Sequence, residues 1–113
     1  MPTIPVSDLT FPHAVLTHAG PLAVCFHGTW CGPSRRLMPI LEKLAADRTL
    51  GLPIATVDVD RQPELTARYG VLSLPLLMVF NGGAPVASLA GFQPAPRVRA
   101  FLAAHAPLAA AAT

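Results

Sequence analysis

Hydrophobic residues are distributed along this chain in short continuous runs that alternate with helically spaced positions. The runs at residues 21–26 (PLAVCF) and 53–59 (PIATVDV) are typical of strands that are covered on both faces of a sheet. Between them, a stripe of apolar positions with helical spacing predicts a helix from Pro33 to about Arg48. Pro39 lies inside this helix and should kink it. The stripe consists of Leu37, Leu41, Leu44 and Ala45.

The remaining segments complete an alternating order of strands and helices. Residues 3–6 (TIPV) predict a short edge strand, because a proline is tolerated there only at an edge. Residues 75–91 predict two strands joined by a turn at two glycines, and further helices are predicted at residues 62–70 and 94–105. The resulting order, β-α-β-α-β-α-β-β-α, predicts an α/β fold in which a mixed central sheet has helices on both faces.

The first helix is expected after the edge strand and should run to about His18. Ser7, Asp8 and Thr10 precede it, and these residue types cap helices by accepting hydrogen bonds from free backbone N–H groups. Pro12 then falls in the first turn, where its missing N–H matters little. One of the three polar residues should therefore be the cap of this helix.

The composition excludes several classes of protein. With 52% hydrophobic and 12% charged residues over 113 positions, the chain can bury a core and is not disordered. We expect a single domain over residues 1–113, with about 107–113 as a frayed tail. The net charge of +2 gives no basic stripe for nucleic acid, and no apolar run approaches the roughly 18 residues of a spanning helix. Without the pattern of a secretory signal at its start, the chain is expected to be a cytoplasmic monomer with reduced thiols.

The most informative motif is Trp30-Cys31-Gly32-Pro33-Ser34, which lies between a predicted strand and a predicted helix. The first turn of a helix has free N–H groups and a partial positive charge. These stabilise a thiolate and lower the pKa of a cysteine there, and a thiolate is the nucleophile of disulfide exchange. Ser34 follows on the same helix face, where its hydroxyl can donate a hydrogen bond to that thiolate.

This motif resembles the active site of the thioredoxin family, which reads Trp-Cys-Gly-Pro-Cys at a strand-to-helix turn. The internal proline Pro39 and the segment YGVLSLP at residues 69–75 also match the order and spacing of the family, so the resemblance covers nearly the whole chain. It implies the thioredoxin fold and thiol–disulfide exchange on protein substrates. It also implies that Pro75 is a cis-proline beside the nucleophile.

The resemblance further implies how a partner binds. The residue before the cis-proline, Leu74, would pair its backbone with an extended segment of the partner, so that binding occurs by β-augmentation. The surrounding site would consist of Trp30, Gly32, Leu74, Pro75 and Gly91.

Two departures from the family concern the same chemical step. Ser34 stands where the family has its second, resolving cysteine, and Cys25 stands where it usually has a buried aspartate, with Thr56 where a lysine neighbour often lies. Attack by Cys31 on a disulfide survives these changes, but release of the mixed disulfide then needs an external thiol such as glutathione. Disulfide isomerisation, deglutathionylation or reversible capture therefore suits the site better than net reduction of protein disulfides.

Alternatives remain for two neighbouring residues. Cys25 is either an inert thiol in a buried strand or a displaced resolving cysteine, which would need a Cα atom within roughly 7 Å of that of Cys31. His27 is either a packed ring or a proton-holding group that lowers the thiol pKa. The other histidines are scattered and suggest no metal site; they are His13, His18 and His105.

Other functions stay open at this stage. The chain can be a binding module or adaptor without redox turnover. Single-thiol glutaredoxins, which share an iron–sulfur cluster with glutathione, usually have Phe or Tyr near the position of Pro33, so we expect no cluster and no other bound cofactor. Ser34 can also be an engineered replacement that traps the mixed disulfide of an ordinary two-cysteine thioredoxin. The absence of the buried acid at Cys25 favours a natural single-thiol site.

Overall fold

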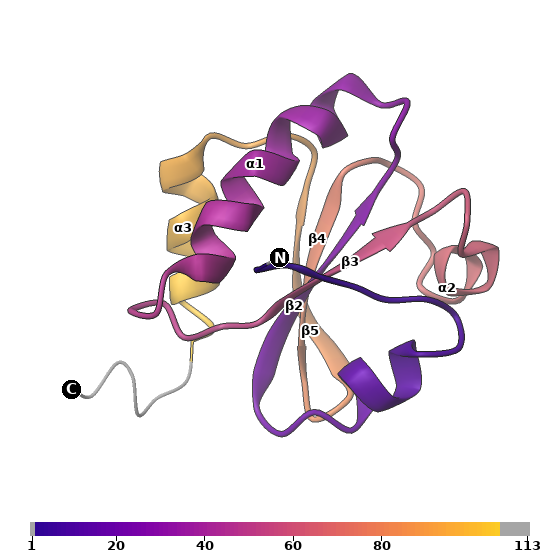
Figure 1. Ribbon diagram of the computed structural model, residues 1–113, viewed down its shortest axis with the longest axis horizontal. Coiled ribbons are helices and arrows are strands. Elements are labelled where there is room, and N and C mark those ends of the chain that lie inside the picture. The colour runs from indigo at the N-terminus through magenta and orange to yellow at the C-terminus, as the bar shows by residue number, and fades with distance from the viewer. Residues whose placement is uncertain (1, 107–113) are drawn as a thin grey trace.

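Five strands form one mixed sheet in the computed structural model, which describes residues 2–106 (Figure 1). The strand order across the sheet is β1-β3-β2-β4-β5. Strands β1, β3 and β2 are parallel, whereas β4 is antiparallel to both β2 and β5. The strands are β1 (Ile4–Pro5), β2 (Pro21–His27), β3 (Ile54–Asp58), β4 (Leu76–Asn81) and β5 (Ala84–Ala90).

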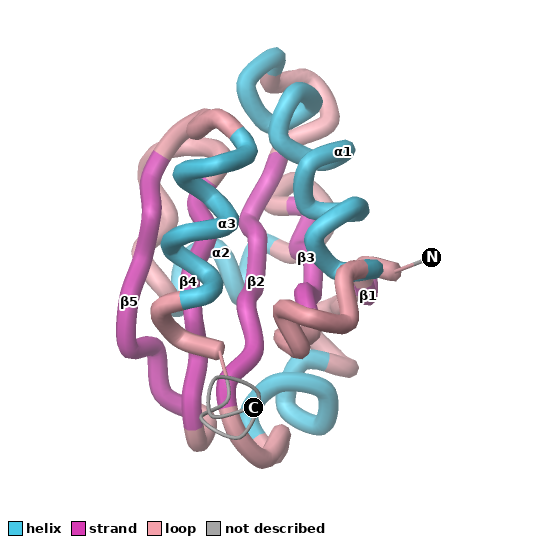
Figure 2. Tube along the Cα trace, turned by 90° about the vertical axis from the view of Figure 1, so that its left-hand side faces the viewer, coloured by secondary structure: helices cyan, strands magenta, loops and turns pink. Residues whose placement is uncertain are grey.

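Helices cover both faces of this sheet (Figures 1 and 2). Helices α1 and α3 pack on one face, and α2 and a π-helical turn, η1, pack on the other. The elements are η1 (Pro12–Leu16), α1 (Gly32–Ala46), α2 (Pro63–Arg68) and α3 (Ala95–Ala103). The element order and the mixed sheet with helices on both faces are those predicted from the sequence, while the frayed tail predicted at about residues 107–113 lies outside the described residues.

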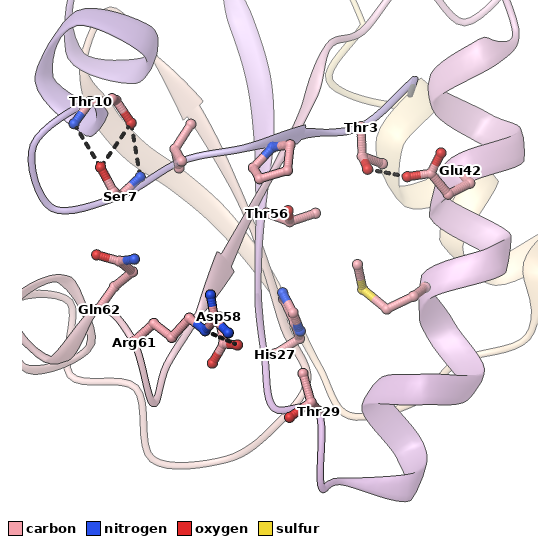
Figure 3. Close-up of a pocket in the computed structure, with 13 residues that line it drawn as sticks. Thr3, Ser7, Thr10, His27, Thr29, Glu42, Thr56, Asp58, Arg61 and Gln62 are labelled. Carbon is pink, nitrogen blue, oxygen red and sulfur yellow. Dashed lines mark hydrogen bonds and ion pairs between the residues drawn. The ribbon is translucent and has the colours of Figure 1, made fainter.

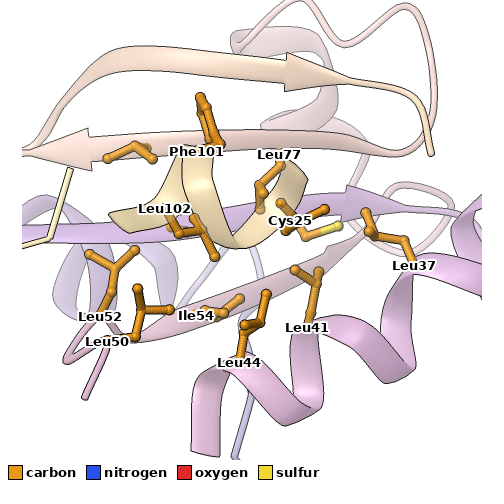
Figure 4. Packing of buried hydrophobic residues seen from close by; sticks show 13 residues of the cluster. Cys25, Leu37, Leu41, Leu44, Leu50, Leu52, Ile54, Leu77, Phe101 and Leu102 are labelled. Atoms are coloured by element: carbon orange, nitrogen blue, oxygen red, sulfur yellow. The ribbon is translucent and has the colours of Figure 1, made fainter. Parts of the chain in front are cut away.

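The central strand β2 explains why the chain needs two cores. Its side chains alternate in direction: Cys25 enters the core under α1 and α3, whereas Phe26 enters the core under η1 and α2. Figure 4 shows the first core, in which Leu41 of α1 and Leu102 of α3 converge on Cys25. The continuous apolar run in the sequence is thus a strand that is buried on both sides, as predicted.

The first helix differs from the prediction. It is a short π-helical turn with Phe11 at its N-cap and no side-chain cap. The Ser7 hydroxyl accepts the Thr10 backbone N–H at 3.2 Å, so this polar pair closes the turn before the helix and does not cap its first residue. The Asp8 carboxylate instead accepts a hydrogen bond from the backbone N–H of Leu65 in α2 at 3.1 Å. The hydroxyls of Ser7 and Thr10 lie 3.2 Å apart and bond to each other.

The C-terminal end of α1 is two residues earlier than predicted, although the helix continues through Pro39. Asp47 leaves the helical conformation with φ −81° and ψ 105°. Its carboxylate accepts hydrogen bonds from both the backbone N–H and the hydroxyl of Thr49, so the chain turns there rather than after Arg48.

The predicted hairpin of β4 and β5 is confirmed, and its turn is docked against another element. Gly82 and Gly83 have φ values of +63° and +82°, as the tight two-residue turn requires. A Cβ atom on Gly83 would lie 2.7 Å from the carbonyl oxygen of Leu16. The turn therefore packs backbone to backbone against the end of η1.

Candidate functional site

Cys31 is the N-cap residue of α1, four residues after the end of β2. Its backbone is extended, with φ −90° and ψ 116°. Its N–H donates to the Gly28 carbonyl oxygen at 3.1 Å, and its own carbonyl accepts from the Arg35 N–H at 3.0 Å. These bonds fix the turn from strand to helix and leave the partly exposed thiol at the helix N-terminus.

The pKa of the Cys31 thiol is lowered, as the sequence predicts. The largest cause is a hydrogen bond from the Ser34 hydroxyl, followed by one from the Ser34 backbone N–H; partial desolvation opposes the shift, and the charges of Arg35 and Arg36 add to it. Ser34 is fully buried, and its oxygen accepts a hydrogen bond from the Gly28 N–H at 3.3 Å. The hydroxyl proton is therefore free to be donated to the sulfur.

Cys25 has the opposite environment. It lies in the core beneath α1 (Figure 4), and burial raises the pKa of its thiol to about 12. Both cysteines are free thiols. Because only a thiolate attacks a disulfide, a thiol with this pKa is inert near neutral pH, which favours the interpretation of Cys25 as a core residue. Its register partner on β3, Thr56, carries no group that ionises at neutral pH.

The environment of His27 does not favour a positive charge on its imidazole, which was one of the two interpretations of this residue. Burial lowers the pKa of its imidazole, although the Asp58 carboxylate opposes the shift, so the ring is neutral at pH 7. Of the described side chains, those of Ser34, Arg35 and Arg36 lower the Cys31 pKa, and His27 is not among them. These directions favour the other interpretation of His27, a packed ring, over a protonated group that acidifies the thiol.

A pocket of about 420 Å³ opens beside the thiol. Its outer edge is apolar, since Leu72 is 98% exposed and Trp30 is 65% exposed. Large apolar side chains in such positions are typical of surfaces that bind a partner. The lining residues are Trp30, Cys31, Val59, Thr66, Val71, Leu72 and Leu74.

Two residues that the sequence analysis did not single out hold Trp30 in place. The indole Nε1–H donates to the Asp60 carboxylate at 2.6 Å. A Cβ atom on Gly28 would lie 3.0 Å from the indole ring, so glycine leaves the space that the ring occupies. A tryptophan N–H usually finds a partner, but nothing in the sequence indicates which acid provides it.

The other predicted site residues adjoin this pocket through the backbone. The Leu74–Pro75 peptide is cis, and the Leu74 carbonyl oxygen lies 4.0 Å from the Cys31 sulfur. The Gly91 N–H donates to the Pro75 carbonyl oxygen at 2.7 Å, which ties the end of β5 to this segment. Gly32 and Pro33 form the first turn of α1, with open space where a Gly32 side chain would lie.

Within residues 2–106, no group of three or more His, Cys, Asp and Glu side chains is arranged to hold a metal ion. The helices in this part of the chain are also too short or too polar to cross a membrane.

Comparisons with known proteins agree with this geometry. The thioredoxin family model matches residues 2–104. A thioredoxin of Alicyclobacillus acidocaldarius is 38% identical over 101 residues, which cover 89% of this chain and 95% of the relative. A thioredoxin of Staphylococcus aureus is 40% identical over 105 residues, which cover 93% of this chain and 99% of the relative. A thioredoxin of Mycobacterium tuberculosis is 40% identical over 89 residues, which cover 79% of this chain and 77% of the relative.

Proposed function

Because the chain belongs to the thioredoxin family of thiol–disulfide exchange proteins, we propose that it performs this exchange with Cys31 as its single nucleophile. One observation carries the proposal: the accessible thiol with a lowered pKa is paired with the hydroxyl of Ser34 rather than with a second thiol. The remaining thiol, Cys25, is buried and has a pKa of about 12.

The proposed reaction has two steps. First, the Cys31 thiolate attacks one sulfur of a substrate disulfide, so that a mixed disulfide forms and the other substrate sulfur leaves as a thiolate. Second, an external thiolate attacks the mixed disulfide, and Cys31 is released as a thiolate again. When the substrate is a glutathionylated protein, the protein thiolate leaves first and a second glutathione then releases oxidised glutathione.

Ser34 has a positioning role in this scheme. Its hydroxyl stabilises the Cys31 thiolate before attack and stabilises it again as the leaving group of the second step. It cannot form a disulfide, so the intramolecular release that a second cysteine would provide at high effective concentration is absent. The scheme therefore requires a reducing compartment with free thiols, such as the cytoplasm.

The proposed partner is an extended protein segment that contains a disulfide or a glutathionylated cysteine. The Leu74 carbonyl lies beside the sulfur, and in this proposal it accepts a backbone hydrogen bond from such a segment. The exposed side chains of Trp30 and Leu72 favour an apolar partner residue next to the reacting cysteine.

Insulin reduction with and without glutathione tests the proposal. The chain alone should show little activity, added glutathione should increase it, and Ser34→Cys should give a clear gain without glutathione. Cys25→Ala is the matched control and should retain the thiol-dependent activity, whereas Cys31→Ala should abolish it. Net reduction of an insulin disulfide by the pre-reduced, unmodified chain without an added thiol would need a second thiol of the chain and would contradict the single-nucleophile mechanism.

Partner affinity distinguishes the proposed exchange function from the alternative of a binding module. If Cys31→Ala binds a partner peptide as tightly as the parent and the parent shows no exchange even with glutathione, the chain is an adaptor. Exchange that depends on Cys31 excludes that alternative.

A further inference from the structure

Two arginines follow the active-site motif in the first turns of α1. Arg35 lies four residues after Cys31, and its backbone N–H donates to the Cys31 carbonyl oxygen at 3.0 Å. Residues with this spacing lie on one face of a helix, and helical side chains lean toward the helix N-terminus. Arg35 and Arg36 are both exposed, and their charges lower the pKa of the Cys31 thiol. An anion that approaches the sulfur therefore meets two positive charges.

Neither of these charges is neutralised within the described part of the chain. Two ion pairs occur within residues 2–106, and neither includes Arg35 or Arg36. Cations next to a reactive thiol raise the local concentration of anionic reactants, so the two arginines favour a substrate that carries a carboxylate. The existing pairs join Arg61 to Asp58 (Figure 3) and Arg99 to Asp47.

The guanidinium group of Arg36 is held in a defined place. It lies over the ring of Phe92, 5.1 Å from the ring centroid, and Phe92 packs against the core under α1 and α3. The residue before Phe92, Gly91, donates its N–H to the Pro75 carbonyl oxygen, which connects this contact to the cis-proline segment of the site. An arginine whose planar group is already positioned loses less conformational entropy when it binds a carboxylate.

Two different surroundings thus meet at the Cys31 sulfur. One is the pocket with Trp30 and Leu72 at its edge, whose lining contains no Asp, Glu, Lys or Arg. The other is the pair Arg35 and Arg36 on α1. A mixed disulfide between a protein and glutathione has two halves that fit these surroundings, because glutathione carries two carboxylates and a net negative charge, whereas an apolar protein segment carries no charge.

We propose that Arg35 and Arg36 bind the carboxylates of a glutathionyl group, and that the substrates of Cys31 are therefore proteins glutathionylated on a cysteine. The Cys31 thiolate attacks the glutathione sulfur, a bond forms between these two sulfurs, and the bond from the glutathione sulfur to the protein sulfur breaks, so that the protein thiolate leaves. A second glutathione thiolate then attacks the glutathionyl sulfur, Cys31 leaves as a thiolate, and oxidised glutathione is released. This assignment rests on the proposed exchange function and selects one of its substrate classes.

The test is a partition experiment with a mixed disulfide of a peptide and glutathione. The reduced full chain is mixed at pH 7 with an excess of a short uncharged peptide whose single cysteine is glutathionylated, and the reaction is quenched early with acid. Mass spectrometry then measures the glutathionyl and the peptidyl adduct of Cys31, which report attack on the two different sulfurs. We expect the glutathionyl adduct to predominate. The ratio of the adducts does not depend on the fraction of Cys31 that is ionised, so a change in the thiol pKa alone does not alter it.

Variants locate the recognition. Arg36→Gln should lower the ratio of glutathionyl to peptidyl adduct about threefold, and the double variant with Arg35→Gln roughly tenfold, because an exposed ion pair contributes up to about a fivefold effect. Replacing both arginines by lysine keeps the charges and should restore most of the ratio. Arg48→Gln is the matched control, since it removes an exposed charge beyond the other end of α1, roughly 15 Å from Arg36 along the helix axis. It should leave the ratio unchanged.

The possible results separate this assignment from the exchange function. An equal ratio in the parent and in the double glutamine variant overturns the assignment of glutathione and leaves the exchange function intact. The same conclusion follows if the peptidyl adduct predominates in the parent, or if Arg48→Gln lowers the ratio as much as Arg36→Gln. The absence of any adduct in the parent, or adducts that persist in Cys31→Ala, would contradict the exchange function and this assignment together.

Discussion

Replacing Gly28 by alanine places a methyl group against the Trp30 ring. The new Cβ atom would lie 3.0 Å from Cε2 and 3.1 Å from Nε1 of the indole, and 3.3 Å from Cδ1 of Leu74. Contacts this short require a neighbour to move by a few tenths of an ångström. Trp30 is the neighbour with room to move, because it is 65% exposed.

The expected effect is small on stability and larger on partner binding. An exposed ring can move outward, so the free energy of unfolding should fall by only about 1 kcal/mol, the low end for overpacking. The same movement displaces the aromatic side chain beside the thiol and lengthens its bond to Asp60. A displaced aromatic anchor should weaken partner binding by about 1–2 kcal/mol, which raises KM roughly 5- to 30-fold.

Trp30 is the only tryptophan in the sequence, so its fluorescence reports the displacement directly. Gly28→Ala should shift the emission maximum, raise KM for a disulfide substrate in the presence of glutathione, and leave the rate of Cys31 alkylation almost unchanged. Gly32→Ala is the matched control for the fluorescence, because a Cβ there meets nothing within 4 Å. An unchanged spectrum and KM for Gly28→Ala, or an equal shift in Gly32→Ala, would refute the steric reasoning.

Three further predictions concern titratable groups. Ser34→Ala removes the main cause of the low Cys31 pKa, so the midpoint of alkylation rate against pH should move to higher pH; an unmoved midpoint would contradict this role. Burial raises the pKa of Cys25 from 9.0 to about 12, so the unfolded chain loses that proton first and the free energy of unfolding should fall between pH 9 and 12 by up to about 4 kcal/mol. Cys25→Ala should remove this slope in urea titrations. The pKa of Asp47 is lowered from 3.8 to about 2 by hydrogen bonds from Thr49 and Arg99; stability should therefore be lost as the pH falls from about 4 to 2, and Asp47→Asn should lose less over that interval.

Much of the fold follows from local patterns in the sequence. The strands β2 and β3 are continuous apolar runs, and the paired glycines between β4 and β5 predict their turn. One of the three candidate caps of the short first helix, Asp8, instead bonds to Leu65, 57 positions later in the sequence. Such a competition between local and distant partners is decided by tertiary structure, which the spacing of residues does not encode.

The candidate site divides in the same way. The pairing of Cys31 with Ser34 could be predicted from the sequence, because the two residues lie three positions apart, within one turn of the same helix. The contribution of Asp60 was not visible, because its bond to Trp30 joins residues 30 positions apart. The neutral state of His27 depends on how deeply the folded chain buries it, and no local motif indicates that depth.

The contact between Gly83 and Leu16 has a practical consequence for engineering. Hairpin tips are commonly chosen for epitope tags, inserted domains or new chain termini, because exposed turns tolerate added residues. Here a Cβ atom on Gly83 would meet the carbonyl oxygen of Leu16 at 2.7 Å, whereas one on Gly82 would meet nothing within 4 Å. Residues added at Gly83 would therefore push the turn away from the end of η1, so reporters should be attached elsewhere.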